Sequence, residues 1–429
     1  MEIATLYTYF KECGRVTTDT RNCPEGSMFI ALKGETFNGN AFAKQALEKG
    51  CRYAVVDEAQ YADDPNIFLV DDCLKTLQML AREHRRQMGT PIVGITGTNG
   101  KTTTKELIAT VLQKRYNVLY TQGNLNNHIG VPLTLLGLTE EHEMAVVEMG
   151  ANHPGEIRTL VNIAEPDCGL ITNVGKAHLE GFGSFEGVVK TKSELYDYLR
   201  SKENAFIFLD KNNHVLCEAS EGLKSIGYGL ESDGLYIKGK LHACAPFLAF
   251  EWEHEGKTYD VNTHLIGAYN VKNALVAIAI GCHFEVPAEA ICEALNGYIP
   301  SNNRSQLTET KDNHLIVDAY NANPTSMMAA LENFRLMEVS HKVAILGDMK
   351  ELGEGSVDEH RKIVSFLEGC GFERIILVGD EFGKANSGFE HYSDVEVVKV
   401  LLAKDKPVGK YILIKGSNSM KLAQLREIL

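Results

Sequence analysis

The sequence predicts an α/β protein built from three domains of unequal size. Its 429 residues correspond to two to four domains at roughly 100–200 residues per domain. Short apolar runs alternate with helical patterns along most of the chain, as in sheets that are covered by helices. Two breaks in this alternation divide the chain into residues 1–88, 89–298 and 299–429. The contents of hydrophobic (44%) and charged (23%) residues are ordinary for a globular protein.

Residues 1–88 are predicted to form a small α/β domain. Apolar residues at positions 74, 77, 80 and 81 form one helical stripe within residues 72–86. The segment Met88-Gly89-Thr90-Pro91 ends this helix, because glycine and proline interrupt regular structure, and marks the first boundary. Strands are expected at 27–32, 54–56 and 67–70.

Residues 89–298 are predicted to form a doubly wound, mostly parallel sheet. An apolar strand at 92–95 is followed by a glycine-rich turn and by a helix at 102–115. Because helical patterns separate the later strands, parallel pairing is favoured. Further strands are expected at 118–120, 144–148, 169–172 and 205–209.

The pattern changes near the end of this central part. Residues 247–252 and 258–261 flank a Glu255-Gly256 turn, which predicts a hairpin in a small antiparallel patch. A helix is expected at 271–282, and the second boundary follows residue 298.

Residues 299–429 are predicted to form a Rossmann-like α/β domain, in which strands again alternate with helices. This part has no G-x-G-x-x-G pattern, so we expect no dinucleotide there. The expected strands are 314–317, 343–346, 374–378 and 411–414.

The composition excludes several classes of protein. Lys and Arg number 43 against 57 Asp and Glu, a net charge of −14, so we expect no nucleic acid partner. The 10 cysteines include no C-x-x-C pair, which argues against a thiolate zinc site and favours free thiols in a reducing compartment. The first residues lack the pattern of a signal peptide. The longest apolar stretch, 274–282, is about half of the ~20 residues that a membrane helix needs, so we expect a cytoplasmic protein without membrane insertion.

Residues 94–104, Gly-Ile-Thr-Gly-Thr-Asn-Gly-Lys-Thr-Thr-Thr, lie between a predicted strand and a predicted helix. In a P-loop, backbone N–H groups and a helix N-terminus surround phosphate oxygens in this context. We expect Lys101 to reach the β- and γ-phosphates and the Thr102 hydroxyl to bind Mg²⁺. The G-x-x-x-x-G-K-[ST] pattern is matched imperfectly, since Ile95 takes the first glycine position and Gly94 precedes it. A glycine-rich turn without a ligand is the alternative. The predicted phosphate-binding residues are Gly97, Thr98, Asn99, Gly100, Lys101, Thr102 and Thr103.

Three ionisable residues follow in the same part of the chain. Glu148 ends a buried strand at the edge where α/β sheets bind ligands, so it is a candidate to share Mg²⁺ with Thr102; capping of a neighbouring helix is the alternative. His178 follows the next strand and is a candidate second ligand, although a lone histidine is more often an ordinary polar residue. Lys192 lies in a helical pattern, which by itself indicates a solvated charge.

Several segments together resemble the Mur ligase family, whose members are ATP-dependent amide ligases of peptidoglycan precursor synthesis. They are Thr96–Thr102, Glu148–Gly150, Asn173–His178 and Gly267–Ala274. Four more resemble the branch that joins D-alanyl-D-alanine to a UDP-N-acetylmuramoyl tripeptide: Asp19–Arg21 with Phe29–Glu35, Thr121–Pro132, Asp318–Met327 and Leu346–Gly353. The Asp-Asn-Pro-Arg motif of the sister ligase that adds the diamino acid is missing. The resemblance implies that ATP activates a carboxylate as an acyl phosphate.

The resemblance also implies roles for individual residues. It assigns catalytic roles to Lys101, Glu148, His178 and Lys192, and two Mg²⁺ ions to Thr102, Glu148, His178 and a carbamylated Lys192. Asn270 and Asn273 would contact adenine, with helix capping as the alternative, and Arg304 and Asp318 would complete the ATP site. The substrate-binding candidates are Thr20, Arg21, Lys33, Gly34, Asn126, Asn127, Ser184, Asn321, Asn323 and Ser326. For Asn321 and Asn323, a local turn is the alternative.

Other functions remain open at this point. A ligase of the same superfamily, such as a folylpolyglutamate synthase, would share the P-loop but would not need the first domain. A P-loop protein that hydrolyses nucleotide to regulate partners would release phosphate without needing both a carboxylate and an amine substrate. An inactive scaffold would not need Lys101, Glu148 and His178. We expect a monomer that acts on small molecules.

Overall fold

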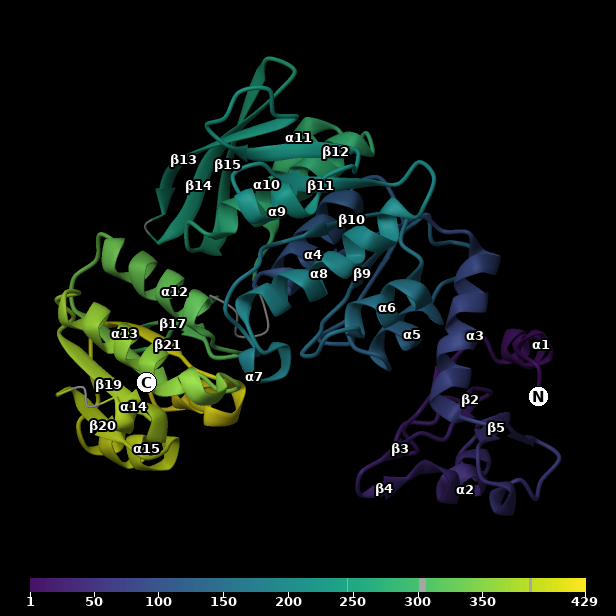
Figure 1. Cartoon of the computed structure of the whole chain (residues 1–429). Coiled ribbons are helices and arrows are strands. Elements are labelled where there is room, and N and C mark those ends of the chain that lie inside the picture. The colour runs from purple at the N-terminus through teal and green to yellow at the C-terminus, as the bar shows by residue number, and fades with distance from the viewer. Residues whose placement is uncertain (245, 301–305, 386–387) are drawn as a thin grey trace.

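The computed structural model describes residues 1–244, 246–300, 306–385 and 388–429. These residues form three main sheets, and each sheet belongs to a different domain (Figure 1). The N-terminal and C-terminal domains lie at opposite ends of the molecule, and the central domain connects them. The predicted α/β class is therefore confirmed. Within the described ranges, no helix combines the length and the apolar character needed to cross a bilayer.

The N-terminal domain contains a parallel sheet in the order β1-β2-β5-β6 and a small β3-β4 ribbon. Its predicted strands and its long helix are present. Asp72 begins that helix by accepting a hydrogen bond from the Lys75 N–H, and Gly89 ends it with φ 66°. The elements are α1 (Ile3–Cys13), β1 (Val16–Thr17), β2 (Met28–Ile30), β3 (Lys33–Gly34), β4 (Phe37–Asn38), η1 (Gly39–Phe42), α2 (Ala43–Glu48), β5 (Tyr53–Val56), η2 (Ala59–Tyr61), β6 (Ile67–Leu69) and α3 (Cys73–Met88).

Helix α3 attaches this domain to the central one. Arg82 and Arg86 both bind the carboxylate of Glu165, at 2.9 and 2.6 Å. The largely buried Arg85 donates to the carbonyl oxygens of Ala164 and Glu165 and to Asp167. Because several charged hydrogen bonds converge on one helix end, the two domains are held in a defined orientation.

The central sheet has nine strands in the order β15-β14-β13-β12-β11-β10-β7-β9-β8. The strands from β8 to β13 in this order pair in parallel, which confirms the predicted parallel pairing for β7 to β11. The central elements up to the edge of the hairpin are β7 (Ile92–Thr96), α4 (Lys101–Leu112), β8 (Val118–Tyr120), α5 (Gly130–Leu135), β9 (Met144–Glu148), α6 (Glu156–Ala164), β10 (Cys168–Ile171), α7 (Leu179–Phe182), α8 (Phe185–Arg200), β11 (Phe206–Asp210), α9 (His214–Ala219) and β12 (Ser225–Leu230).

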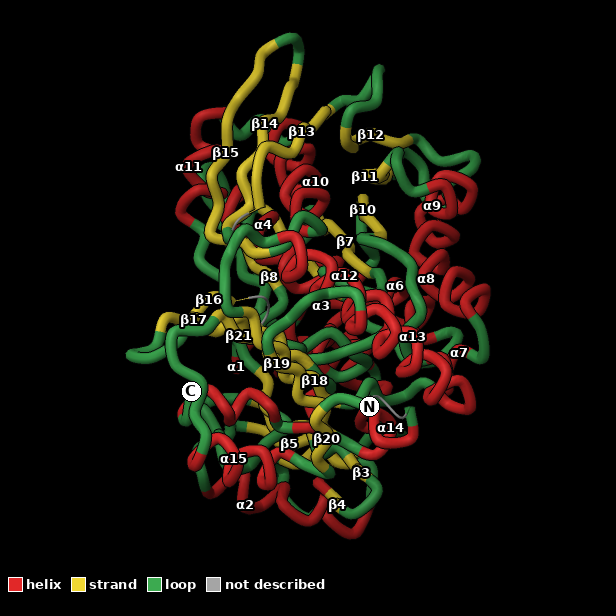
Figure 2. Tube along the Cα trace, turned by 90° about the vertical axis from the view of Figure 1, so that its left-hand side faces the viewer, coloured by secondary structure: helices red, strands yellow, loops and turns green. Residues whose placement is uncertain are grey.

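The antiparallel region is larger than predicted. The expected hairpin is β14 and β15, but it continues the main sheet through β13, and neither β12 nor β13 was predicted. Residues 240–243 of β13 are exposed, so its hydrophobic pattern is weak. These strands stand at one end of the molecule, far from β3 and β4 (Figure 2). The elements are β13 (Ile237–Cys244), β14 (Phe247–His254), β15 (Lys257–Ile266), α10 (Asn270–His283) and α11 (Ala288–Gly297).

The C-terminal sheet has the order β16-β17-β21-β18-β19-β20. The four predicted strands form its parallel centre, whereas the short edge strands β16 and β20 were not predicted. The elements are β16 (Gln306–Glu309), β17 (His314–Asp318), α12 (Pro324–Leu336), β18 (Lys342–Gly347), η3 (Gly353–Gly355), α13 (Ser356–Glu368), β19 (Arg374–Val378), α14 (Asp380–Lys384), β20 (Glu390–Tyr392), α15 (Val395–Lys404), β21 (Tyr411–Lys415), η4 (Asn418–Met420) and η5 (Leu422–Glu427).

The core of the central sheet gives a direct test of the fold. Phe208 on β11 is 0% exposed, and Phe208→Ala is expected to lower the free energy of unfolding by about 3–5 kcal/mol because it leaves a cavity. Val400 on α15 is 58% exposed, so Val400→Ala should change the free energy of unfolding by less than about 0.5 kcal/mol. Urea unfolding followed by circular dichroism measures both values. Equal effects of the two variants would contradict this core.

Candidate active site

The loop between β7 and α4 has the shape that the P-loop prediction requires. Gly97 and Gly100 have φ values of 141° and 78°, which L side chains rarely adopt. A Cβ atom at position 97 would lie 2.1 Å from Oγ1 of Thr172, and one at position 100 would lie 3.0 Å from the Asn273 amide. Both positions therefore require glycine.

Gly94 is needed for packing and not for the loop, which explains why it does not fall at the first glycine position of the motif. It lies within β7, where a Cβ atom would approach the Met149 side chain to 2.9 Å and Pro166 to 3.0 Å. It is thus required for packing beneath the sheet. The glycine that opens the loop is Gly97.

The end of β10 braces this loop. The Asn173 carbonyl oxygen accepts the N–H of Thr98 at 2.9 Å, and its Oδ1 accepts the N–H of Asn99 at 3.0 Å. The Thr172 hydroxyl donates to the Asn99 carbonyl oxygen at 2.7 Å. Lys101 lies over the loop, with Nζ donating to the carbonyl oxygens of Gly97 and Thr98 at 2.8 and 3.0 Å.

Two buried side chains whose oxygen atoms could bind a metal ion, Thr102 and Glu148, meet at the start of α4. Thr102 Oγ1 donates to Glu148 Oε2 at 2.9 Å, and the Asn126 amide donates to Oε1 at 2.8 Å. Thr102 and Glu148 are 2% and 1% exposed. A hydroxyl and a carboxylate side by side are ligands that Mg²⁺ prefers, so this pair fits the expected metal. The Glu148 carboxylate accepts hydrogen bonds from two side chains and does not cap a helix, which was the alternative interpretation.

His178 and Lys192 have different partners in this structure. His178 Nδ1 contacts Glu351 Oε2 of the C-terminal domain. Lys192 is 2% exposed, and its Nζ donates to the Ala151 carbonyl oxygen at 3.1 Å. Lys192 is therefore buried rather than solvated, contrary to what the helical pattern alone indicates.

The electrostatics show that these groups face a common region. Burial lowers the pKa of Lys192 well below its usual value, and the charge of Lys101 lowers it further. Burial also lowers the pKa of His178 against the opposing charge of Glu351, while Lys101 and Lys192 add to the decrease. The mutual effects show that Lys101, His178 and Lys192 lie close enough to influence one another.

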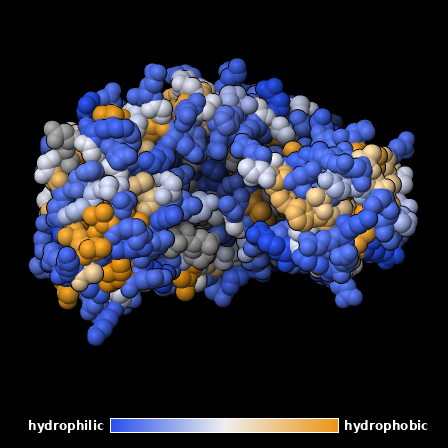
Figure 3. Space-filling view, turned by 90° about the horizontal axis from the view of Figure 1, so that it is seen from below, coloured by the Kyte–Doolittle hydropathy of each residue, from blue (hydrophilic) through white to orange (hydrophobic). Residues whose placement is uncertain are grey.

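A cavity of about 790 Å³ opens in front of the P-loop. Its walls come from all three domains, and Figure 3 shows a hollow with mainly hydrophilic surroundings between the C-terminal domain on the left and the N-terminal domain on the right. The predicted residues that line it are Thr98, Asn99, Gly100, Lys101, Thr103, Asn126, Asn127, Glu148, His178, Asn270, Asn273, Asp318, Asn321, Asn323 and Ser326.

The C-terminal domain reaches the P-loop through the start of α12. The side-chain amide of Asn323 donates to Asn99 Oδ1 at 2.7 Å. Asn323 also caps α12 in a capping box with Ser326. Asn323 therefore has a local structural role, as the alternative of a local turn expects, in addition to its contact with the P-loop. Nearby, Lys415 Nζ binds Asp318 Oδ2 at 2.5 Å, and both residues line the cavity.

The two asparagines at the start of α10 do not act as its cap. Tyr269 occupies the N-cap position and makes no side-chain capping bond. The Asn273 amide donates to Asn270 Oδ1 at 2.8 Å, and the Asn270 amide donates to the Ile266 carbonyl oxygen at 2.8 Å. Both asparagines line the cavity beside Tyr269.

Some predicted substrate residues are not part of this cavity. Arg21 pairs with Asp19 at 2.8 Å, and Lys33 pairs with Asp57 and Glu58 at 2.8 and 3.0 Å in the N-terminal domain. Ser184 accepts the Gly187 N–H and caps α8. Thr20 and Gly34 also lie outside the lining, and Arg304 lies outside the described residues.

Another part of the lining was not predicted from the sequence. It consists of side chains on the facing helices α3 and α6, namely Leu74, Gln78, Glu156, Thr159 and Leu160. Their spacings of three and four residues are the signal that places them on one helix face. The spacing does not indicate that α3 and α6 border the same cavity.

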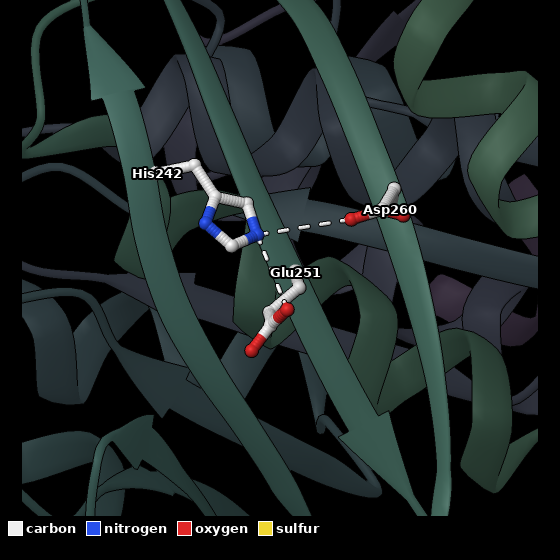
Figure 4. Close-up of side chains that lie close together, drawn as sticks. All are labelled: His242, Glu251 and Asp260. Atoms are coloured by element: carbon white, nitrogen blue, oxygen red, sulfur yellow. Dashed lines mark ion pairs between the residues drawn. The ribbon is translucent and has the colours of Figure 1, made fainter.

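His242, Glu251 and Asp260 form a separate cluster on the strands β13–β15 (Figure 4). His242 Nε2 lies 3.2 Å from Glu251 and 3.7 Å from Asp260. Asp260 is largely exposed, and Lys240 also reaches Glu251 at 3.5 Å. We assign these contacts to cross-strand pairing on the solvent face of the sheet.

Comparison with known protein families gives three matches. Residues 95–281 match the Mur ligase middle domain, residues 303–418 the Mur ligase glutamate ligase domain, and residues 13–85 the Mur ligase family catalytic domain.

Full-length relatives are similar over almost the whole chain. The chain is 34% identical to the UDP-N-acetylmuramoyl-tripeptide–D-alanyl-D-alanine ligase of Bacillus subtilis (strain 168), covering 96% of this chain and 92% of the relative. The chain is also 34% identical to the enzyme of the same name from Escherichia coli (strain K12), and the match covers 96% of this chain and 92% of the relative.

Solved structures agree. MurF from Acinetobacter baumannii has a TM-score of 0.88 at 29% identity and covers 99% of this chain and 97% of that one. MurF from Thermotoga maritima, in complex with ADP, has a TM-score of 0.86 at 28% identity and covers 96% of each. A folylpolyglutamate synthase from Thermotoga maritima has a TM-score of 0.61 at 16% identity over 83% of this chain and 93% of that one, a likeness of fold alone.

The P-loop geometry predicts the effect of a single methyl group. Gly97→Ala should weaken ATP binding by about tenfold or more, because the added Cβ meets Thr172 and the residue keeps a strained φ. Gly234→Ala is the matched control, since Gly234 has φ 73° and an added Cβ would have nothing within 4 Å. Isothermal titration calorimetry with a non-hydrolysable ATP analogue measures both affinities. Unchanged affinity in Gly97→Ala would contradict the assignment of this loop.

Proposed function

The chain belongs to the Mur ligase family, and we propose that it joins D-alanyl-D-alanine to a UDP-N-acetylmuramoyl tripeptide as ATP is converted to ADP and phosphate. The observation that carries the proposal is one cavity lined by the P-loop, by Glu148, which accepts the Thr102 hydroxyl, and by polar residues of the C-terminal domain. An amide ligase needs these parts together, because it must activate a carboxylate and then admit an amine.

The first step is a phosphoryl transfer. A carboxylate oxygen of the peptide attacks the γ-phosphorus of ATP, the bond to the β-phosphate oxygen breaks, and an acyl phosphate and ADP result. The enzyme contributes position and charge rather than covalent chemistry. The N–H groups of the loop and Lys101 would bind the phosphates, and Lys101 lies within reach, as it now donates to the carbonyl oxygens of the loop.

The second step forms the amide. The neutral amine of D-alanyl-D-alanine attacks the acyl carbon, phosphate leaves with its oxygen, and the nitrogen loses a proton. Positive groups near the tetrahedral oxygen lower the barrier. We propose that Asn321, Asn323 and Ser326 orient the dipeptide, since they line the cavity beside the P-loop.

The metal and nucleotide contacts complete the proposed site. Thr102 and Glu148 would hold Mg²⁺, which supplies neutralisation of the phosphate charge when bound. We propose His178 as a further ligand and place adenine near Asn270 and Asn273.

Lys192 is the proposed site of carbamylation. Carbon dioxide adds to a neutral amine, with loss of a proton, to give a carbamate. The lowered pKa of Lys192 favours the neutral amine, and its contact with Ala151 places it next to the cavity. A carbamate at Lys192 would place a negatively charged oxygen close to His178, where it could serve as a ligand of a second metal ion.

The remaining proposals concern the setting of the reaction. The N-terminal domain, with Thr20, Arg21, Lys33 and Gly34, is proposed to bind the uridine part of the substrate, outside the reaction cavity. We also propose that the protein is a monomer. Soluble nucleotide substrates support a cytoplasmic location.

The decisive experiment is a phosphate-release assay. Rapid turnover is expected only with ATP, the UDP-muramoyl tripeptide and D-alanyl-D-alanine together, and not with glutamate as the amine. Lys101→Ala should lower kcat by about 10³-fold because a positive charge at the phosphates is lost. The control is Lys114→Ala, which removes a lysine just beyond the other end of α4. Equal phosphate release without the amine would favour a regulatory ATPase instead.

Lys192 has its own test. Lys192→Ala should lose activity by about 100-fold or more, and added short carboxylic acids should restore part of it by replacing the carbamate. The control Lys190→Ala alters an exposed lysine of the same helix and should retain activity. Failure of every such acid to restore activity would count against the carbamate, although not against the ligase.

A further inference from the structure

Glu351 places a carboxylate of the C-terminal domain against His178, which belongs to the central domain. Its Oε2 contacts His178 Nδ1, and its backbone carbonyl oxygen accepts the Glu180 N–H at 3.4 Å. The Nδ1 atom is buried, and within the described residues Glu351 is the acid that reaches it. The carboxylate therefore takes up Nδ1 and leaves Nε2 as the ring nitrogen that can bind a ligand.

Both residues of this contact have a left-handed backbone. His178 has φ 50° and Glu351 has φ 63°, which L side chains rarely adopt. Glycine takes such a conformation without strain, so the turn at position 351 does not by itself require a glutamate. Strained backbone concentrates at functional sites, where the surrounding structure maintains it. The contact between two strained residues of different domains thus indicates a role for the Glu351 side chain.

The loop that carries Glu351 is fixed to the C-terminal sheet. The buried Asp348 carboxylate accepts two N–H groups in the first turn of α14, at 3.1 and 3.0 Å. The Met349 N–H donates to Nε2 of the buried His360 at 3.0 Å. Ser417 Oγ accepts the N–H of the next residue at 2.9 Å. The C-terminal domain therefore presents the Glu351 carboxylate on a rigid support.

The His178 ring is also supported from within its own domain. The Phe182 ring meets it at an angle of 80°, with the ring centroids 6.3 Å apart, and Phe182 is buried. Lys192 Nζ lies over the same Phe182 ring, 5.1 Å from its centroid. One aromatic ring thus packs against both His178 and Lys192, while Glu351 contacts His178 from the other domain.

Further contacts between the two domains lie just before His178 in the chain. Lys176 Nζ binds the Glu359 carboxylate at 3.0 Å, and the Lys176 N–H donates to Thr325 Oγ1 at 3.3 Å. Both partners belong to the C-terminal domain. The position of that domain therefore determines whether Glu351 reaches His178.

We propose that Glu351 is a positioning residue, which holds the His178 imidazole with its proton on Nδ1 and so leaves Nε2 for a metal ion. This inference rests on the proposed function, because it assumes that His178 is a metal ligand. A carboxylate on the far nitrogen of such an imidazole fixes the ring and its tautomer and makes it a stronger ligand. Since Glu351 belongs to the C-terminal domain, the ligand is fully oriented only when that domain lies against the central one.

The test measures Mn²⁺ binding rather than turnover. The full chain is titrated with Mn²⁺ in the presence of a non-hydrolysable ATP analogue, the UDP-muramoyl tripeptide and bicarbonate, and free Mn²⁺ is followed by electron paramagnetic resonance. Glu351→Ala should weaken Mn²⁺ binding by about tenfold or more. Glu351→Gln should recover part of this loss, because its amide oxygen can still accept from Nδ1. Glu354→Ala is the matched control, since it removes an exposed acid three residues further on.

Two further variants separate positioning from a purely structural role. Glu351→Gly relieves the strained backbone, so it should keep a melting temperature close to that of the wild type and yet bind Mn²⁺ as weakly as Glu351→Ala. His178→Ala should weaken Mn²⁺ binding, and Glu351→Ala added to it should cause no further loss, because Glu351 acts through His178.

The outcomes distinguish this inference from the proposed function. Unchanged Mn²⁺ binding in Glu351→Ala, together with weaker binding in His178→Ala, would overturn the inference alone. A further loss in the double variant would also overturn it, since Glu351 would then act independently of His178. Unchanged binding in His178→Ala would refute His178 as a metal ligand, and the inference would fail with that part of the proposed function.

Discussion

The candidate active site depends on how the residues after β10 hold the loop that follows β7. Thr172 and Asn173 supply hydrogen bonds to Thr98 and Asn99, and they leave no space for a side chain at Gly97. These contacts hold the loop in the shape that the P-loop prediction requires. Preorganised N–H groups need no rearrangement during the reaction, which is the main source of their catalytic value. The parallel pairing of β10 with β7 is what brings the two segments together.

The main features of this arrangement could be predicted from the sequence. Strands such as 92–95 and 144–148 are buried on both faces and appear as continuous apolar runs, so their ends, and with them Gly97 and Glu148, were located correctly. The strand β13 was missed because its residues 240–243 are exposed and carry no apolar pattern. Edge strands such as β20 are too short to give a signal.

The site was harder to predict where it depends on contacts between domains. Glu351 meets His178, and Asn323 meets Asn99, across sequence separations that no local pattern encodes. Glu156 was missed for the same reason, since its spacing shows a helix face but not what that face borders. Conversely, the burial of Lys192 was not evident from its helix, where polar neighbours indicate solvent.

Ion pairs attach both outer domains to the centre, and the C-terminal domain adds an uncharged hydrogen bond. Arg82 and Arg86 join the N-terminal domain through charged contacts that are partly exposed, and dissolved ions screen such contacts. The amide pair of Asn99 and Asn323 carries no net charge, so its strength is nearly independent of ionic strength. The C-terminal domain thus retains a directional, uncharged link to the phosphate loop in concentrated electrolyte.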